Sequence, residues 1–215
     1  MLLLWYPTFA WAGNVVYERS NMAIEQTLVI VKPDGVQRGL LGEILGRFEH
    51  VGLKVVGMKL TWPDAEHVGK HYSSDERYLT EVGEKALANA QARGVTLLET
   101  ALDIGQRVRE ANMRYLSTGP VLVMVLEGNT AIQTVRSIIG GTNPLTADIG
   151  TIRGDLTIDD FAQADKESRA VRNLMHASSD ASEAQREIAL WFEKSELHEY
   201  QTVMDKVLHD PTWGA

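Results

Sequence analysis

The residue types best suited to chemistry lie in the last quarter of the chain, where a histidine stands among hydroxyl groups and a carboxylate. His176 follows an apolar run, Ser178 comes two residues later, and Glu187 comes eleven residues after the histidine. A neutral imidazole can attack phosphorus directly, and a bonded carboxylate would fix its tautomer and stabilise the phosphoimidazole. A single histidine at the end of a strand is more often only structural, so the rest of the chain must decide.

The elements around His176 are predicted from the local pattern. Residues 171–175 form a short apolar run typical of a strand, and residues 177–180 are small and polar, as in a turn that ends in a helix N-cap. Residues 181–192 then predict a helix with Ile188 and Trp191 available for the core. Glu187 would lie near the middle of this helix, from which its carboxylate could reach back towards His176.

Six sequence blocks, in a fixed order over about 165 residues, resemble the nucleoside diphosphate kinase family. The resemblance runs from about Thr27 to Phe192. The blocks are residues 27–39 with Lys32-Pro33-Asp34-Gly35, 119–128, Val135-Arg136, Gly141-Thr142-Asn143-Pro144, 150–155 with Thr151-Ile152-Arg153-Gly154-Asp155, and 173–180 with the histidine. This resemblance implies a kinase that moves a γ-phosphoryl group from a nucleoside triphosphate to His176 and then to a second nucleoside diphosphate.

The order of the predicted elements agrees with that family's fold. Strands are expected at 26–32, 53–62, 120–127 and 171–175, and helices at 39–50, 64–72, 130–139 and 181–192. This βαββαβ order predicts an α+β, ferredoxin-like sandwich: an antiparallel four-stranded sheet with helices on one face, plus inserted helices. An RNA-binding module can share this topology, but these strands lack the aromatic and basic residues that grip RNA on a sheet.

The resemblance assigns roles to the polar residues at the site. Lys32 at a strand end, Arg136 on the third helix and Arg153 would contact phosphate oxygens, because fixed cations stabilise the charge of a transferring phosphoryl group. Further expected contacts are Thr142 to phosphate, Asn173 to sugar or phosphate, and Tyr72 near His176 or the phosphate. Ser178 would bond Glu187, although it could also be a plain N-cap. Each of these residues would also be unremarkable as a surface or turn residue.

Two insertions separate this chain from the shorter members of that family. Between Tyr72 and Gly119, residues 75–93 and 95–116 predict two helices, an insertion of about 75–116. Counting back from Gly119 places Val108 where the shorter form has an aromatic residue that stacks on the base, so stacking is in doubt there, and Tyr78 is one possible substitute. The second insertion, about residues 156–170, lengthens the loop before the histidine strand.

Composition is that of a globular enzyme and sets limits on its partners. The 215 residues are 44% apolar and 23% charged, with a formal charge of −8 and no cysteine. An acidic chain with this pattern predicts no nucleic-acid surface, and it must gather its few cations locally to bind polyphosphate. The sequence holds no Gly-x-x-x-x-Gly-Lys-Ser/Thr loop and no metal-ligand spacing, so we expect no protein-held metal and Mg²⁺ carried by the nucleotide phosphates.

The two ends of the chain are interpreted as extensions of a domain over residues 22–193. Residues 1–21 begin with an apolar run too short to span a bilayer, which favours an upstream or extended start over an export signal. Residues 194–215 predict one more helix that packs on the subunit or on a neighbour. We assign no role to the remaining histidines, which are expected at the surface: His50, His67, His71, His198 and His209.

The resemblance also implies the assembly and the cellular setting. We expect a homo-oligomer, a hexamer or tetramer, that acts on nucleoside triphosphates and diphosphates in the cytoplasm, with no membrane partner. Two other functions use the same fold: a phosphohistidine carrier that hands phosphate to proteins, and a catalytically silent nucleotide-binding regulator. The full set of expected site residues argues against the silent form, because a decayed site should have lost some of them.

Overall fold

A computed structural model describes residues 24–210 and 212–214 and contains one antiparallel sheet of four strands in the order β2-β3-β1-β4. The strands are β1 (Ile24–Val31), β2 (Lys54–Thr61), β3 (Val121–Asn129) and β4 (Met175–Ala177). This is the predicted ferredoxin-like sheet, in which the two long central strands β1 and β3 pair along their whole lengths. The expected extension at residues 1–21 lies outside the described residues.

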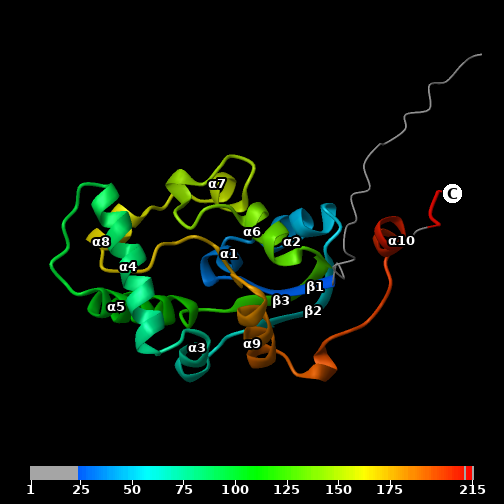
Figure 1. Ribbon diagram of the computed structural model, residues 1–215, viewed down its shortest axis with the longest axis horizontal. Helices are drawn as coiled ribbons and strands as arrows, with labels where there is room; N and C mark the ends of the chain where they lie inside the picture. Colours follow the sequence, from blue (N-terminus) through cyan, green and yellow to red (C-terminus); the bar gives the residue numbers. More distant parts are fainter. Residues whose placement is uncertain (1–23, 211, 215) are drawn as a thin grey trace, which may run out of the picture.

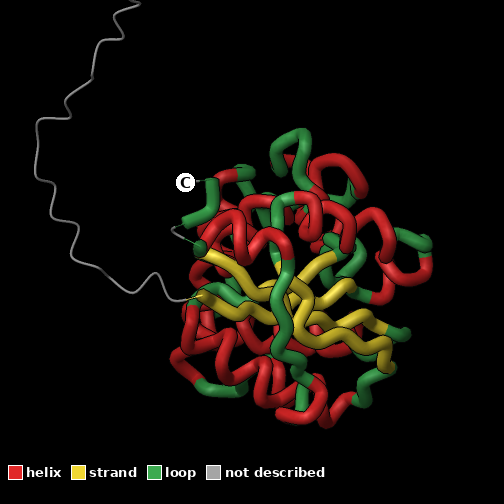
Figure 2. Tube along the Cα trace, turned by 90° about the vertical axis from the view of Figure 1, so that its right-hand side faces the viewer, coloured by secondary structure: helices red, strands yellow, loops and turns green. Residues whose placement is uncertain are grey.

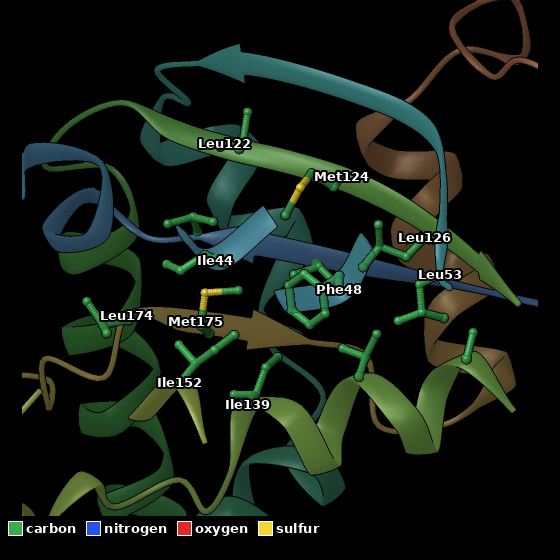
Figure 3. Packing of buried hydrophobic residues seen from close by; sticks show 14 residues of the cluster. Ile44, Phe48, Leu53, Leu122, Met124, Leu126, Ile139, Ile152, Leu174 and Met175 are labelled. Carbon is green, nitrogen blue, oxygen red and sulfur yellow. The ribbon is translucent and has the colours of Figure 1, made fainter. Parts of the chain in front are cut away.

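One face of the sheet is covered by α2 (Leu41–His50) and α6 (Ala131–Ile139), the two helices of the βαββαβ order. Alternate strand residues point to the same face of a sheet, so Val29 and Val31 of β1 share this core with Phe48 of α2 and Val135 of α6. Figure 3 shows the packing, with Phe48 and Met175 near its centre. This side of the molecule agrees with the prediction.

The opposite face is also covered, which places the sheet between two helical layers (Figure 2). Leu28 and Ile30 of β1 point to this side and pack with Val68 and Trp191. These two residues come from α3 (Ala65–His71) and α9 (Ala181–Trp191), and the end of α5 (Ala101–Leu116) adds Leu116. The second layer brings α3 and α9 side by side, and this contact matters for the site.

The first insertion folds as a helical hairpin of α4 (Glu76–Ala92) and α5. The second helix begins at Ala101 rather than at the expected 95, because the side chain of Thr100 caps it by accepting from the Asp103 amide. The helices touch through glycine: a Cβ at Gly83 would lie 1.7 Å from the Ala101 carbonyl oxygen, so only glycine permits this approach. The hairpin gathers at one end of the molecule (Figure 1).

The second insertion forms α8 (Phe161–Lys166), which lies beside α4 (Figure 1). An ion pair joins the two insertions, since Arg93 Nη2 is 2.7 Å from an Asp165 carboxylate oxygen. Before α8 the chain makes a short 3-10 turn (Pro144–Thr146) and α7 (Ile152–Leu156), and another short helix, α1 (Pro33–Gln37), directly follows Lys32. The two insertions therefore form one connected surface.

Two predicted elements were wrong. The strand expected at residues 171–175 is instead β4 at 175–177, so His176 sits within the strand, opposite Ile30 of β1, rather than after it. Leu174 has a left-handed backbone (φ 65°), which a strand cannot continue.

The tail was the second error. The single helix expected after residue 194 is a 3-10 turn (Lys194–Glu196), an extended stretch and a short α10 (Val203–His209). The extended stretch is held on β2, where the His198 amide donates to the Val56 carbonyl at 2.7 Å and the Tyr200 hydroxyl to the Val55 carbonyl at 2.8 Å. Within the described part of the chain, no helix has the length and apolar character that crossing a membrane requires.

Candidate active site

His176 is held at the sheet edge by a buried carboxylate from α9. Its Nε2 lies 3.0 Å from both carboxylate oxygens of Glu187, and the Ser178 hydroxyl donates to Glu187 Oε2 at 2.6 Å. Glu187 is 1% exposed and Ser178 fully buried. Ser178 is not the helix cap, because the Asp180 side chain accepts from the Glu183 amide and caps α9. Nε2 therefore carries a proton shared by the carboxylate, and Nδ1 is the unprotonated nitrogen.

The charge states at this network follow from burial. Burial lowers the pKa of His176, and the positive charge of Lys32 lowers it further, so the imidazole is neutral at pH 7. Burial also raises the pKa of Glu187, while the hydroxyl of Ser178 and the positive charge of Arg186 oppose that rise. The site thus presents a neutral, oriented imidazole bonded to a carboxylate.

Lys32 projects from the end of β1 into the same region and is 6% exposed. Its Nζ donates to Asn173 Oδ1 at 2.8 Å, and Asn173 Nδ2 donates to the Thr142 carbonyl at 3.0 Å. Burial, followed by the charge of Arg153, lowers the pKa of Lys32 to about 7. The side-chain amide of Asn173 therefore links two other predicted site residues, Lys32 and Thr142. The contact with Thr142 is to its backbone carbonyl and not to its hydroxyl.

Arg153 binds the backbone on both sides of Leu174. Its three nitrogens donate to the carbonyls of Asn173 at 3.0 Å, Gly140 at 2.9 Å and Met175 at 2.8 Å. A guanidinium has five N–H donors, so two remain for another partner. Burial and the charge of Arg136 lower the pKa of Arg153 to about 10. No sequence pattern indicated this backbone role, because the carbonyls lie 13 residues before and 20 and 22 residues after Arg153.

A pocket of about 700 Å³ opens beside His176. Its histidine end, as we call it, is formed by Lys32, Tyr72, Arg136, Thr142, Arg153, Asn173 and His176, so the structure brings seven of the nine predicted site residues to its wall. Ser178 and Glu187 lie behind His176. Around the whole pocket, the described lining residues include eight lysines or arginines and one carboxylate, Asp165, which is paired with Arg93. Three further lining arginines are paired with carboxylates outside the lining: Arg107, Arg114 and Arg169. The excess positive charge therefore comes from Lys32, Lys85, Arg136 and Arg153, and it favours a polyanion.

The other end of the pocket, here called the insertion end, is built by α4, α5 and α8. It includes Val82, Asn89, Val108, Asn112 and Phe161. Val108 does face the pocket, as the count from Gly119 predicts, and Phe161 is the phenylalanine that the second insertion adds to the wall. Tyr78 is not part of this lining. The insertions thus form a helical wall at this end of the pocket.

His71 was wrongly expected at the surface. The residue ends α3, is 2% exposed and lies directly behind the catalytic network. Its Nδ1 is 3.4 Å from Glu187 Oε1 and accepts from Trp191 Nε1 at 3.2 Å, and its ring meets that of His176 edge to face with centroids 4.5 Å apart. Local sequence could not show this, because Glu187 and Trp191 lie more than 110 residues away. The available signal in the sequence was the spacing: His71 follows apolar Val68 by three residues, which places both side chains on the same face of a helix.

The other histidines are less involved. His50 and His198 are exposed as expected, whereas His67 is half-buried on α3, with its ring 4.4 Å from that of Trp191. The side chain of His209 lies outside what the structure describes.

The fold does create one histidine and carboxylate cluster, although none was visible in the sequence. Ligand atoms of His71, His176 and Glu187 lie within 4.8 Å of one another. Each already takes part in a hydrogen bond, and the guanidinium of Arg186 stands 3.6 Å from Glu187 Oε1. A cation would have to displace these bonds and face that charge, so the donor set fits a proton network rather than a metal.

The fold and the site together define a phosphotransferase. The family model described as nucleoside diphosphate kinase matches residues 25–80 and 104–197, and the unmatched interval covers most of α4, the connection that follows it and the start of α5. The chain belongs to the nucleoside diphosphate kinase family.

Relatives in several lineages are similar along nearly all of their length. A nucleoside diphosphate kinase of Pyrobaculum aerophilum is 42% identical over 83% of this chain and 100% of its own. One of Neurospora crassa is 38% identical over 82% and 91%. The solved structure of a Borrelia burgdorferi enzyme, a transition-state mimic with bound vanadate and ADP, matches with a TM-score of 0.71 at 33% identity, covering 86% of this chain and 97% of that one.

Proposed function

We propose that this chain is a nucleoside diphosphate kinase that transfers a γ-phosphoryl group through His176. The observation that carries the proposal is the neutral imidazole whose Nε2 is held by buried Glu187, in a pocket whose wall also holds Lys32, Arg136 and Arg153. A nucleophilic histidine needs one free ring nitrogen and a fixed tautomer. Both conditions are met where a polyphosphate would be drawn in.

The first half-reaction follows from that arrangement. The lone pair of Nδ1 attacks the γ-phosphorus, the bond from this phosphorus to the bridging oxygen breaks, and the nucleoside diphosphate leaves with that oxygen. The imidazole gains positive charge as the new bond forms, while the proton on Nε2 stays in place. Glu187 stabilises that charge, and Ser178 holds Glu187. The second half-reaction returns the phosphoryl group to another diphosphate by the reverse route.

The cations at the histidine end would neutralise the charge on the phosphoryl oxygens. We assign this to Lys32, Arg136 and the two uncommitted N–H donors of Arg153, with the Thr142 hydroxyl as a further donor. Asn173 holds Lys32 and would meet sugar or phosphate with its remaining N–H. Tyr72 would place its phenol beside the transferred group. Burial raises the pKa of Tyr72, so the phenol keeps its proton and can donate.

Mg²⁺ enters this scheme as part of the substrate. The described pocket lining holds one carboxylate, Asp165, already bonded to Arg93, so we do not expect this lining to supply the ligands of the ion. Phosphate oxygens and water would bind Mg²⁺, and the side chains named above would bind the remaining phosphate oxygens.

The insertion end would hold the base and sugar. Val108 and Phe161 supply apolar surface there, on which bases of different kinds can pack, and we expect broad tolerance of nucleosides from family membership. The rest of the proposal follows family membership: a cytoplasmic enzyme that assembles as a hexamer or tetramer. Light scattering of the purified protein measures the assembly directly, and a monomer would overturn that part.

The experiment that tests the function uses γ-labelled Mg-ATP, followed by GDP. We expect a labelled protein that is acid-labile and alkali-stable, as phosphohistidine is, and that gives up its label to form labelled GTP. The His176→Ala variant should take up no label, with His50→Ala, at an exposed position, as the matched control. Labelling of His176→Ala at the wild-type rate would disprove the assignment.

The same experiment separates the two other functions. A phosphocarrier would take up label but pass it to a protein rather than to GDP. A silent nucleotide-binding regulator would bind ATP and take up no label. Neither result is expected, because the nucleophile, its carboxylate and the cationic pocket are all present in one site.

A further inference from the structure

We propose that His71 is a positioning residue for phosphoryl transfer. It accepts a hydrogen bond from the indole N–H of Trp191, and Glu187 therefore stays bonded to His176. The inference rests on the proposed function, since it concerns how the carboxylate behind the nucleophile is used.

The first step is the hydrogen-bond direction. Indole Nε1–H can only donate, so its 3.2 Å contact makes His71 Nδ1 the acceptor and places the proton of the neutral ring on Nε2. Trp191 is 4% exposed, and a buried N–H without a partner is unfavourable. The indole therefore needs an acceptor at this point.

The second step is the identity of the competing acceptor. Glu187 Oε1 lies 3.4 Å from the same Nδ1, beside the acceptor that the indole uses. Glu187 Oε1 and Trp191 Nε1 both approach His71 Nδ1, so if Nδ1 were removed this carboxylate oxygen would be the acceptor on the far side of the vacated position. A bond from Trp191 to Glu187 would draw the carboxylate away from His176 Nε2 and reduce the charge available to the imidazole.

The third step is the restraint on the nucleophile itself. The His71 ring packs edge to face against that of His176, with an interplanar angle of 79°. The His71 position is also anchored, because Arg109 of α5 donates to the Tyr72 and Gly69 carbonyls and Arg186 of α9 donates to the His71 carbonyl at 3.3 Å. His71 thus blocks rotation of the His176 ring that would turn Nδ1 from the pocket.

The charges around His71 agree with a neutral ring. Glu187, His176, Arg186 and Lys32 act on it electrostatically, and burial, the largest effect, lowers the pKa of His71 well below its ordinary value. A neutral His71 adds no positive charge beside an imidazole that becomes positive as it is phosphorylated.

The test compares four variants by rapid-quench measurement of phosphoenzyme formation. His71→Leu removes the acceptor, and we expect the rate constant at saturating ATP to fall about 10- to 100-fold, with the dissociation constant for ADP unchanged. His71→Asn places an amide oxygen where Nδ1 stood and should restore the rate to within a few-fold. His67→Leu is the matched control, since it lies one turn away on α3 and touches Trp191 but not Glu187; its rate should not change.

The decisive variant is the pair His71→Leu with Trp191→Phe. If the freed indole N–H diverts Glu187, deleting that N–H should recover about tenfold of the lost rate. A merely structural His71 predicts the opposite, a double variant slower than either single one, and that result would overturn the proposal, as would a wild-type rate in His71→Leu. Failure of the proposed function is separate, because the wild-type protein would then take up no label. Thermal unfolding of each variant verifies folding.

Discussion

The two ends of the pocket are built in opposite ways. At the histidine end, buried side chains bond to one another in fixed pairs, such as Glu187 with His176 and Lys32 with Asn173. At the insertion end, the helices bring apolar side chains and amides to the wall, and an ion pair on α4 and α8 is the link across it. Chemistry requires fixed geometry, whereas holding many bases requires only surface and space. Substitutions at the histidine end should therefore lower the rate of phosphoryl transfer, whereas substitutions at the insertion end should change KM for the nucleotide.

The largest effect is expected from the arginines of the histidine end. Arg136→Ala and Arg153→Ala should each lower kcat/KM about 10- to 1000-fold, the loss of a charge-assisted phosphate contact. Only Arg153→Ala should also lower Tm, because it removes a buried side-chain donor from three backbone carbonyls, whereas Arg136 is exposed on α6. Steady-state kinetics and calorimetry check both points. Unchanged kinetics in both variants would make these residues simple structural or surface charges.

A smaller effect is expected at the hydroxyl behind the nucleophile. Ser178→Ala removes the 2.6 Å donor to Glu187 and should lower kcat about tenfold, the value of one hydrogen bond to a charged group. The adjacent Ser179→Ala is a matched control, since that hydroxyl bonds half-buried Glu183 instead of Glu187. A Ser178→Ala rate equal to that of the control would mean that the Ser178 hydrogen bond is not required to orient Glu187 towards His176.

Lys32 gives the histidine end a pH dependence that the insertion end should lack. Its pKa of about 7 means that the amine loses its proton as pH rises through neutrality, so nucleotide affinity of the free enzyme should fall over that range. Lys32→Arg, which stays charged, should remove this dependence, and titration of ADP binding from pH 6 to 9 measures it. Affinity of the wild type that stays constant over the range would contradict the prediction.

The same lysine affects stability with the opposite sign. In the unfolded chain a lysine keeps its proton to about pH 10.5, whereas folded Lys32 loses it near 7. Between these values the unfolded state binds more protons, so raising the pH favours the folded state. The Lys32 contribution to the free energy of unfolding should increase from pH 7 upwards and level off beyond 10.5. Denaturant unfolding of wild type and Lys32→Met, compared at several pH values, isolates it.

The smallest effect is expected at the insertion end. Val108→Phe adds a ring facing the pocket and should lower KM for purine nucleotides by about fivefold, or roughly 1 kcal/mol of stacking. The rate of phosphoryl transfer should not change, because stacking acts equally on ground and transition states. Val95→Phe, on the exposed connection before α5, is the control. Unchanged KM for every nucleotide would show that Val108 does not face the base.

The sequence alone determined the elements and the chemical groups. Apolar periodicity placed most strands and helices within two residues, since it reflects which face of each element is buried. The pattern also predicted that His176, Ser178 and Glu187 lie close together, because a strand, a turn and a helix in succession return the chain to the same place. These contacts are local, so spacing was sufficient.

Only the tertiary structure decided what lies behind and beside those groups. Arg153 binds carbonyls on both sides of Leu174, whose left-handed backbone moved the strand to 175–177, and no local pattern records that pairing. His71 meets Glu187 because α3 and α9 pack on the same face of the sheet, although they are more than 100 residues apart. The residue type alone does not say whether a histidine is exposed or buried. The burial of His71 depends on a helix more than 100 residues later in the chain.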